Sequence, residues 1–418
     1  MKTVIVLIFS FLFFCSELFA ENWVQVPSGF NVVFYGVSFS KSNPNIGFAV
    51  GEAGTILGTY DGGSTWWTSN SNVAYWFQSV STIDNNNAFA VGFDPYNGYA
   101  KIFRTTTGGT YWDALWGNVY TTLNSVSFSD PLHGTAVGRF GTTIRTTDGG
   151  VNWNPQTASS YDLQGVCFIN NNTGWIVGSL GTIRKTTNGG MNWLNQQSPD
   201  TNKLFCVSFY NDLYGSAVGA DGIIINTTDG GFTWRRCSAN VVVALNGVSQ
   251  TSRYNITVVG NMGTILRSND GGNSFHIQPI NNPNLTLYSV CFMTALKGVA
   301  VGGSGYILKT TNAGGDSNSV IGIHNIGTQF PDHFILYQNY PNPFNPSTSI
   351  KFSIDKNSFV TLRVFNILGQ EIKTIVNNYL NSGTYEYNFN GRNLSSGIYF
   401  YNLRTNEGSQ TKRMFLAK

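Results

Sequence analysis

The segment IRTTDGGVNW, which spans Ile144–Trp153, recurs along the chain with small changes. It returns as IRKTTNGGMNW at Ile183–Trp193 and as IINTTDGGFTW at Ile224–Trp234. Equivalents of its Asp-Gly-Gly sequence begin at Asp61, Thr107, Asp148, Asn188, Asp229, Asp270 and Asn312, with successive steps of 46, 41, 40, 41, 41 and 42 residues. A period near 41 residues is typical of one four-stranded propeller blade. The sequence therefore predicts an all-β fold with a seven-bladed β-propeller.

Each repeat contains four segments that predict four strands. An inner strand is indicated by runs such as SVSF from Ser125 and GVCF from Gly165. A second strand ends in Val-Gly, as in TAVG up to Gly138, a third follows Gly-Thr-Ile, and a fourth begins at the Trp of the repeated segment. The alternation Val-x-Phe places two large side chains on one sheet face, which stacked blades can bury.

The Asp-Gly-Gly hairpin is interpreted as a structural turn. Asp accepts hydrogen bonds from backbone amides, Gly adopts positive φ, and Trp supplies a large apolar surface. One catalytic site would not need seven copies of a turn. The predicted structural residues are Asp61, Asp148, Asn188, Asp229, Asp270 and Asn312, with Trp66, Trp112, Trp153, Trp193 and Trp234.

The seventh repeat lacks its Trp strand. It ends TTNAGGDSNSV, whereas the segment ENWVQVPSG near the start of the chain is similar to NWNPQTAS at Asn152–Ser159. Trp23 is therefore predicted to begin the missing outer strand. A blade built from both ends of the repeat region closes the ring and removes a free edge.

Composition and charge agree with an exported all-β protein. Charged residues make up 11%, aromatic residues 14%, and the formal net charge is +3, too small to indicate nucleic-acid or anionic-membrane binding. Lys2 followed by the apolar run VIVLIFSFLFF predicts a signal peptide over residues 1–20, cleaved near Ala20, with no membrane span in the mature chain.

The remaining titratable side chains predict neither a disulfide framework nor a metal site or cofactor. Cys167, Cys206, Cys237 and Cys291 fall on repeat positions that keep them too far apart to pair. The four histidines show no metal-ligand spacing. We expect buried free thiols and no bound metal or cofactor.

The repeat stops near Gly315, which bounds the propeller at residues 21–315. Residues 316–333 are predicted to be a linker. Strand-like runs such as VTLRVFN, GTYEYNF and GIYFYNL then alternate with Gly and Asn turns, so residues 334–418 predict a small immunoglobulin-like β-sandwich.

Two resemblances to known families accompany these patterns. The motifs NYPNPFNPST, VFNILGQEI, LSSGIYFYNL and TKRMFLAK resemble the type A sorting domain of the type IX secretion system. That resemblance implies that the secretion machinery recognises residues 334–418 and carries the chain across the outer membrane. The expected location is therefore secreted or on the cell surface. The pattern VGxxGTIxxTxDGGxxW resembles the photosystem II assembly factor propellers, and more distantly the Asp-box (BNR) sialidases. An exported chain does not fit photosystem assembly.

Aromatic residues concentrate in loops on the face opposite the hairpins, in blades 1–3. The proposed ligand-binding residues there are Trp76, Phe93, Tyr96, Tyr99, Trp116 and Tyr120. Exposed aromatics on a rigid face suit sugar rings or protein partners. The alternative is that these side chains pack the loops against each other.

Catalysis requires a different pattern. Glycoside hydrolysis usually needs two carboxylates, and Glu52 with Asp94 or Asp221 would be the candidates. The arginines before the hairpins, such as Arg104 and Arg145, recur at one repeat position and are interpreted as contacts between blades. The sequence thus favours a secreted or surface-attached binding and scaffold protein for an extracellular glycan or protein, with a sialidase-like glycoside hydrolase as the alternative.

Overall fold

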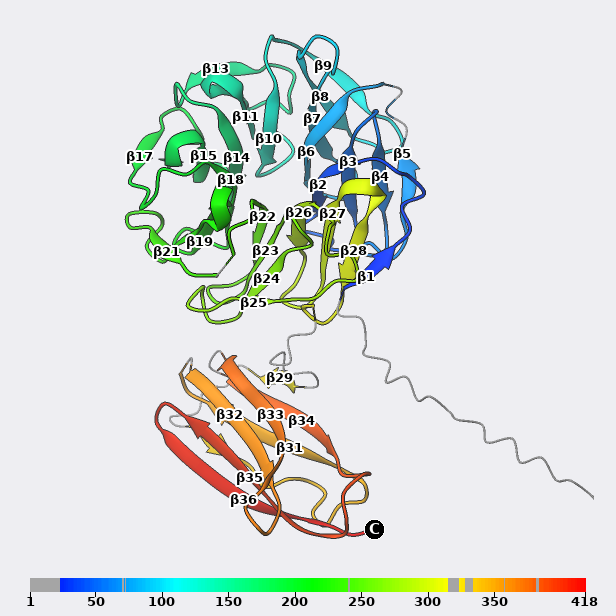
Figure 1. Cartoon of the computed structure of the whole chain (residues 1–418), viewed down its shortest axis with the longest axis vertical. Coiled ribbons are helices and arrows are strands. Elements are labelled where there is room, and N and C mark those ends of the chain that lie inside the picture. Colours follow the sequence, from blue (N-terminus) through cyan, green and yellow to red (C-terminus); the bar gives the residue numbers. More distant parts are fainter. Residues whose placement is uncertain are drawn as a thin grey trace, which may run out of the picture.

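The computed structural model describes residues 23–69, 71, 73–239, 241–314, 323–327, 334–356, 358–380 and 383–418. The predicted signal peptide lies outside these residues. The described residues form nine four-stranded antiparallel sheets. Seven of these sheets are the blades of a propeller, arranged around one axis (Figure 1).

The first four blades follow the chain in order. Blade 1 consists of β2 (Phe34–Phe39), β3 (Gly47–Gly51), β4 (Ile56–Thr59) and β5 (Trp67–Ser69). Blade 2 consists of β6 (Trp76–Thr82), β7 (Ala88–Phe93), β8 (Ala100–Thr105) and β9 (Asp113–Val119). Blade 3 consists of β10 (Leu123–Phe128), β11 (Gly134–Gly138), β12 (Thr142–Thr146) and β13 (Asn154–Thr157). Blade 4 consists of β14 (Leu163–Phe168), β15 (Gly174–Gly178), β16 (Ile183–Thr186) and β17 (Leu194–Gln196).

The last three blades complete the ring. Blade 5 consists of β18 (Leu204–Phe209), β19 (Gly215–Gly219), β20 (Ile224–Thr227) and β21 (Arg235–Cys237). Blade 6 consists of β22 (Leu245–Gln250), β23 (Ile256–Gly260), β24 (Ile265–Ser268) and β25 (His276–Ile277). Blade 7 consists of β26 (Leu287–Phe292), β27 (Gly298–Gly302), β28 (Ile307–Thr310) and β1 (Val24–Val26).

Blade 7 closes the ring as the sequence predicts. Strand β1 pairs antiparallel with β28, with Val24 opposite Lys309 and Val26 opposite Ile307. Trp23 packs edge to face on Phe292, with ring centroids 5.8 Å apart. Phe168 and Trp193 of blade 4 make the same contact at 5.9 Å. Trp23 therefore takes the place of the hairpin Trp that the seventh repeat lacks.

A line of hydroxyl groups joins the inner strands of neighbouring blades. Serines at two alternate positions of the inner strands accept hydrogen bonds from backbone N–H groups of an adjacent inner strand, at 3.0–3.3 Å. These serines, which we call the serine belt, are Ser38, Ser79, Ser81, Ser125, Ser127, Ser208, Ser249 and Ser289. The inner edge of each sheet has no strand partner, so the belt satisfies amides that would otherwise lack one.

Hydrophobic cores lie between blades rather than within them. One cluster combines Val299 and Ile307 of blade 7 with Phe34, Val37 and Leu57 of blade 1. Another combines residues of blade 4, including Trp175, with residues of blade 5. No single sheet can bury its own apolar surface, and each blade therefore depends on its neighbours for stability.

The repeated hairpins use their polar side chains internally. In blade 1, Asp61 Oδ1 accepts hydrogen bonds from the N–H groups of Ser64 and Thr65 at 2.8 and 2.9 Å. The Thr59 hydroxyl donates to the same carboxylate and accepts the N–H of Gly63 at 3.0 Å. The structure thus agrees with a turn-forming role for these residues.

The hairpins also bind one blade to the next. Arg104 of blade 2 donates to the carbonyl of Gly149 in blade 3 at 3.0 Å, and Lys185 of blade 4 donates to that of Gly230 in blade 5 at 3.0 Å. These bonds confirm that the basic residues before the hairpins contact the neighbouring blade.

All four cysteines in the described residues are free. Cys167, Cys206 and Cys291 occupy serine-belt positions, and the Cys206 thiol lies 4.0 Å from the carbonyl oxygen of Val248. Burial raises the pKa of Cys206 and of Cys237 to about 11. Cys237 is buried as expected, whereas the other three residues are only partly buried because they line the seams between inner strands.

The C-terminal region contains two further sheets. One has the order β29 (Ile323–Gly327), β34 (Gly383–Asn390), β31 (Ser347–Ile354) and β30 (Ile335–Leu336). The other, which we call the outer sheet, has the order β33 (Glu371–Leu380), β32 (Ser358–Phe365), β35 (Gly397–Thr405) and β36 (Gly408–Leu416). Both contribute to one core that includes Ile350, Phe352, Leu362, Tyr401 and Met414. An immunoglobulin-like topology for these two sheets remains a prediction.

The predicted linker differs from the structure in one segment. Residues 323–327 form strand β29, which pairs with β34 so that Ile323 lies opposite Tyr387. The segment IHNIG is short, and its pairing depends on a strand about 60 residues later, so no local pattern indicates it.

Candidate functional site

Two faces of the propeller differ in the loops they carry. The Asp-Gly-Gly hairpins lie beside the turns that follow the inner strands, as the bond from Gly149 N–H to the Leu132 carbonyl shows. The turns after the second strands lie beside the loops that link successive blades, as the bond from Ser179 N–H to the Asp162 carbonyl shows. We call these the hairpin face and the loop face. This division agrees with the one inferred from the sequence.

Tight turns with left-handed backbone conformation cover the loop face. In blade 4, Leu180 has φ 54° and ψ 39°, Gly181 has φ 64°, and the Thr182 N–H bonds to the Ser179 carbonyl at 3.1 Å. Two consecutive residues with positive φ define a type I′ turn, which favours Asn-Gly or Asp-Gly. The equivalent first residues, with φ between 51° and 54°, are Ala53, Phe140, Leu180, Asp221, Met262 and Ser304.

Three of these turns display large apolar side chains. Phe140 is 78%, Leu180 62% and Met262 69% exposed, so none is needed in a core. Left-handed conformation costs a residue other than Gly, Asn or Asp about 1–2 kcal/mol. An Asp at this position, as in blade 5, avoids most of that cost. These residues were not among those predicted from the sequence, although a bulky residue before Gly in RFG, SLG and NMG is a readable signal.

Glycine is required at the second position of the turn. A Cβ on Gly181 would lie 2.1 Å from the carbonyl oxygen of Asp200 in the loop to blade 5. The turns therefore pack closely against the loops between blades, and this packing fixes the backbone that carries the exposed apolar side chains.

Blade 2 replaces the tight turn with an extended hairpin between β7 and β8. Asp94 holds it, accepting bonds from the Tyr96 N–H at 2.9 Å and the Asn97 side chain at 2.8 Å. Tyr96 at the tip is 91% exposed. Burial and the nearby Asp94 carboxylate raise the pKa of Tyr75 in the adjoining loop.

The structure brings the predicted aromatic residues together in two pairs. Trp76 and Phe93 are direct partners in the β6–β7 ladder, with ring centroids 6.0 Å apart. Tyr99 and Tyr120 meet edge to face at 5.5 Å, and they are 49% and 69% exposed. The side chain of Trp116 lies outside the described residues, although its backbone belongs to β9. The aromatic residues thus pack partly on each other and keep an exposed surface.

The candidate catalytic carboxylates lie in separate blades. Glu52 accepts hydrogen bonds from the Val33 N–H and the Tyr35 hydroxyl, both at 3.1 Å. Burial and the Glu52 carboxylate raise the pKa of Tyr35. Asp94 binds its own loop in blade 2, and Asp221 forms a turn tip in blade 5, on a different part of the ring. Glu52 and Asp94 therefore lie in adjacent blades, and Asp221 lies three blades beyond Asp94.

A cavity of about 130 Å³ lies on the propeller axis. Each inner strand contributes one side chain from an equivalent repeat position to the lining: Tyr35, Gln78, Asn124, Gln164, Phe205, Asn246 and Tyr288. These groups are neutral. Pockets for small-molecule ligands usually measure ~300–1,000 Å³, so the axial cavity alone is too small for one.

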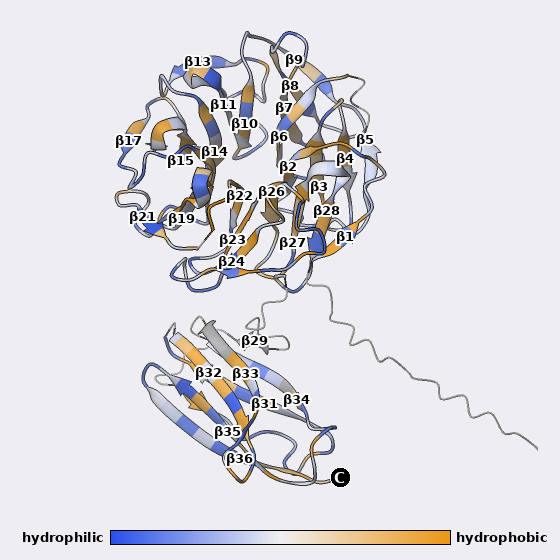
Figure 2. Cartoon of the chain, in the orientation of Figure 1, coloured by the Kyte–Doolittle hydropathy of each residue, from blue (hydrophilic) through white to orange (hydrophobic). Residues whose placement is uncertain are grey.

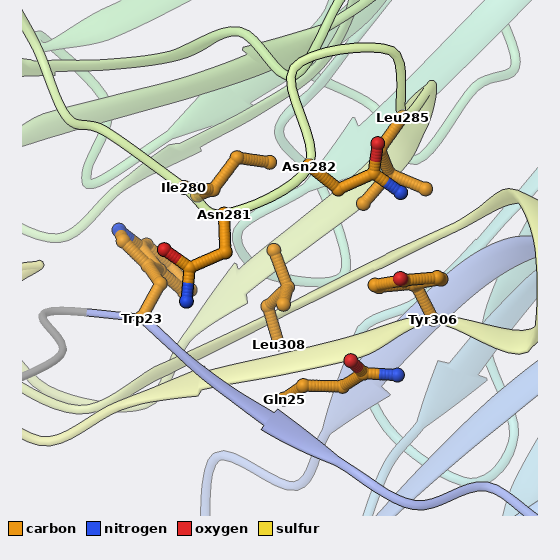
Figure 3. Close-up of a pocket in the computed structure, with 8 residues that line it drawn as sticks. All are labelled: Trp23, Gln25, Ile280, Asn281, Asn282, Leu285, Tyr306 and Leu308. Carbon is orange, nitrogen blue, oxygen red and sulfur yellow. The ribbon is translucent and has the colours of Figure 1, made fainter.

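A second hollow, of about 180 Å³, lies where the ring closes (Figure 3). It is bordered by Trp23 and Gln25 from the first strand, by Tyr306 and Leu308 from the last repeat, and by Ile280, Asn281, Asn282 and Leu285 from the loop between blades 6 and 7. The Trp23 indole donates to Gln278 at 2.8 Å beside this hollow. The residues that border this hollow belong to the strands and the loop that meet where the ring closes.

Within the described part of the chain, no group of three or more His, Cys, Asp or Glu side chains is placed to hold a metal ion. The same residues contain no helix with the length and apolar character needed to cross a membrane.

Comparison with family models decides the relationship of the propeller. The model described as photosynthesis system II assembly factor YCF48 matches residues 15–117, 106–200 and 158–244, which together span more than half of the 418 residues. The chain belongs to the YCF48 family. A second model, described as a secretion system C-terminal sorting domain, matches residues 338–417.

Individual YCF48-type proteins agree with this assignment. The photosystem II stability/assembly factor HCF136 of Cyanidioschyzon merolae is 46% identical over 44 residues, which is 10% of either chain. The structure of YCF48 from C. merolae superposes with a TM-score of 0.58 at 21% identity, over 69% of this chain and 98% of that one. YCF48 bound to a D1 peptide gives 0.59 at 20% identity, over 71% and 96%.

The same fold occurs in an enzyme. The GH74 enzyme of Niastella koreensis superposes with a TM-score of 0.57 at 13% identity, over 80% of this chain and 59% of that one. Similarity at this identity concerns the propeller architecture alone.

Proposed function

We propose that this YCF48-family chain is an exported binding and scaffold protein that captures an extracellular protein segment on the loop face of its propeller. One observation carries the proposal: Tyr96, Phe140, Leu180 and Met262 stand 62–91% exposed on that face, and three of them occupy strained turns. Solvent exposure and backbone strain both oppose stability, so folding alone does not account for these side chains.

The surroundings suit recognition of a polypeptide. The turns are short and packed on the loops between blades, so little conformational entropy is lost when a ligand binds. Tyrosine, phenylalanine and methionine are enriched at protein interfaces. The exposed Tyr99–Tyr120 pair and the Trp76–Phe93 pair would add an aromatic platform in blade 2. The YCF48 structure with a bound D1 peptide supports a peptide ligand.

The sorting domain supports an extracellular setting. Its match over residues 338–417 agrees with recognition of residues 334–418 by the type IX secretion machinery and with a secreted or outer-surface location. The export signal would be the N-terminal segment 1–20, and residues 21–315 would form the functional propeller. A glycoside hydrolase is the less favoured proposal, because Glu52 and Asp94 accept hydrogen bonds from their own blades and Asp221 lies at a turn of blade 5.

Peptide and glycan arrays probed with the full mature chain test this function. We expect binding to a subset of peptides, weakened at least tenfold in Tyr96→Ala and in Leu180→Asn. Phe232→Ala is the matched control, because Phe232 is 88% exposed but lies in the Asp-Gly-Gly hairpin of blade 5 on the hairpin face. The proposal fails if no peptide binds, if Phe232→Ala weakens binding equally, or if only glycans bind.

A further inference from the structure

The two sheets of the sorting domain differ on their outward faces. On the sheet that contains β31 and β34, the side chains that alternate with the core residues are polar, among them Ser349, Lys351, Thr384 and Glu386. This is the usual pattern for an antiparallel sheet with one face on a core and the other in water.

The outer sheet breaks that pattern. Its core-facing residues, such as Val360, Leu362 and Val364, are fully buried. Its outward residues are nevertheless largely aromatic, aliphatic or basic. We call them the Phe/Arg face: Phe359, Arg363, Phe365, Ile398, Phe400, Arg404, Arg413 and Phe415.

Strand register arranges these side chains in rows. Phe400 lies opposite Phe365 on one side and opposite Arg413 on the other. Ile398 lies opposite Phe415, and Arg404 opposite Thr361. Directly opposed side chains have Cβ atoms about 4.5–5.5 Å apart, so the rows form a continuous surface across β32, β35 and β36. Figure 2 shows hydrophobic and hydrophilic segments mixed along these strands.

The Phe/Arg face is open to solvent and concave. Phe359, Ile398, Phe400 and Phe415 are 36–44% exposed. A hollow of about 430 Å³ lies on it, bordered by Phe359, Arg363, Phe365 and Arg404 together with Thr361, Asn402, Thr405 and Asn406. Its size falls within the range of recognition pockets.

Charge is concentrated in the same domain. Residues 334–418 contain nine Lys and Arg and four Asp and Glu, a formal charge of +5, compared with +3 for the whole chain. Arg363 pairs with Glu371 at 3.4 Å, which shows that the face accommodates a carboxylate. Among the described residues, Arg404 and Arg413 make no ion pair. Two guanidinium groups are therefore available to carboxylates from outside.

We propose that the Phe/Arg face docks onto an acidic protein surface, with apolar side chains ringed by carboxylates, during export of the chain. The inference rests on the proposed export function and names the surface that serves it. A protein is favoured over a lipid membrane because the face holds a hollow of about 430 Å³ and Arg363 on it already pairs with a protein carboxylate. Arg and Phe are also among the residue types enriched at protein interfaces.

Secretion of the full chain in a bacterium with a type IX system tests the proposal. Arg404→Glu and Phe400→Ser should each lower the secreted fraction at least fivefold, with the remainder retained in the cell. Lys351→Glu, on the polar sheet, changes charge equally and should leave secretion unchanged. Thermal unfolding of the purified variants confirms that the domain is folded, and Arg404→Lys should restore part of the secretion.

Several results would overturn the proposal. Normal secretion of folded Arg404→Glu and Phe400→Ser would exclude a role of the Phe/Arg face in export. An equal loss of secretion in Lys351→Glu would show that the net charge of the domain, and not this face, determines export. Binding of the full chain to phosphatidylglycerol vesicles, abolished by Arg404→Glu, would replace the protein partner by a membrane. Tyr96→Ala, which tests the loop face, should be secreted normally, so the two proposals fail separately.

Discussion

The indole of Trp23 donates a hydrogen bond to the side chain of Gln278 across 255 positions of sequence. The same indole packs on Phe292 of the last blade. Gln278, which follows the outer strand of blade 6, also donates to the carbonyl of Ala313 at 2.6 Å, so it links the strand that begins after Trp23 to the last hairpin of the repeat region.

Trp23→Ala should destabilise the propeller by ~3–5 kcal/mol, since it removes a buried aromatic ring and one of the hydrogen bonds of Gln278. Trp23→Phe should cost clearly less, because the edge-to-face contact with Phe292 survives. Denaturant midpoints of the two variants give the comparison. Equal stability of Trp23→Ala and the wild type would contradict ring closure through this residue.

Leu180→Asn should raise the free energy of unfolding by about 1 kcal/mol, because asparagine adopts left-handed conformation readily at the first position of a type I′ turn. Asp221→Leu, at the equivalent turn of blade 5, should lower it by a similar amount. Thermal or urea unfolding measures both. If both substitutions were neutral, the turns would not be strained.

Stability should fall in acid through the hairpin carboxylates. Burial alone would raise the pKa of Asp61, but hydrogen bonds from Thr65, Thr59 and Ser64 lower it to about 2. The pKa values of Asp148, Asp229 and Asp270 are also lowered. A folded-state pKa below the unfolded value of ~3.9 stabilises the protein above about pH 4, and this stability is lost as pH falls towards 2.

Thermal midpoints between pH 5 and pH 2 should therefore decrease, and the decrease should be smaller in Asp61→Asn. Asparagine is a fair control, because Asn188 already accepts the Asn192 N–H at the equivalent position. A midpoint independent of pH over this range would contradict the assignment.

The free thiols should resist alkylation in the folded protein. The thiolate is the reactive form, and burial raises the pKa of Cys206 to about 11, so iodoacetamide at pH 8 should label the native protein about a hundredfold more slowly than the urea-unfolded protein. Cys206→Ser should fold with stability within about 1 kcal/mol of the wild type, because Ser125 occupies the equivalent position and accepts the Val166 N–H. Mass spectrometry and denaturant unfolding measure the two effects.

The repeat made much of this fold predictable. Strand order and ring closure follow from local signals, since the Asp-Gly-Gly turns and the Val-Gly strand ends recur at a fixed period, and Trp23 matches the absent seventh Trp. The meaning of the serine belt is not local, because its hydroxyl groups satisfy amides in a different blade. Strand β29 depends on a distant partner in the same way.

The exposed residues of the loop face were harder to predict from the sequence, because most of them do not disturb the repeat. Aromatic residues such as Tyr96 and Tyr99 were visible as an insertion, because they lengthen one repeat. Phe140, Leu180 and Met262 fit the repeat spacing and so resembled ordinary turn residues. The structure shows that they share the left-handed backbone conformation of Asp221 at the equivalent position, and that their apolar side chains are exposed.

The split seventh blade also sets the timing of assembly. Translation delivers β1 first and its partner β28 only after every other blade has left the ribosome. Strand β1 therefore has no partner until the whole repeat region has been made. A chain that ends before Ile307 lacks β28 and cannot close the ring. Because β1 and β28 both precede the sorting domain in the sequence, proteolytic removal of that domain would leave the propeller ring closed.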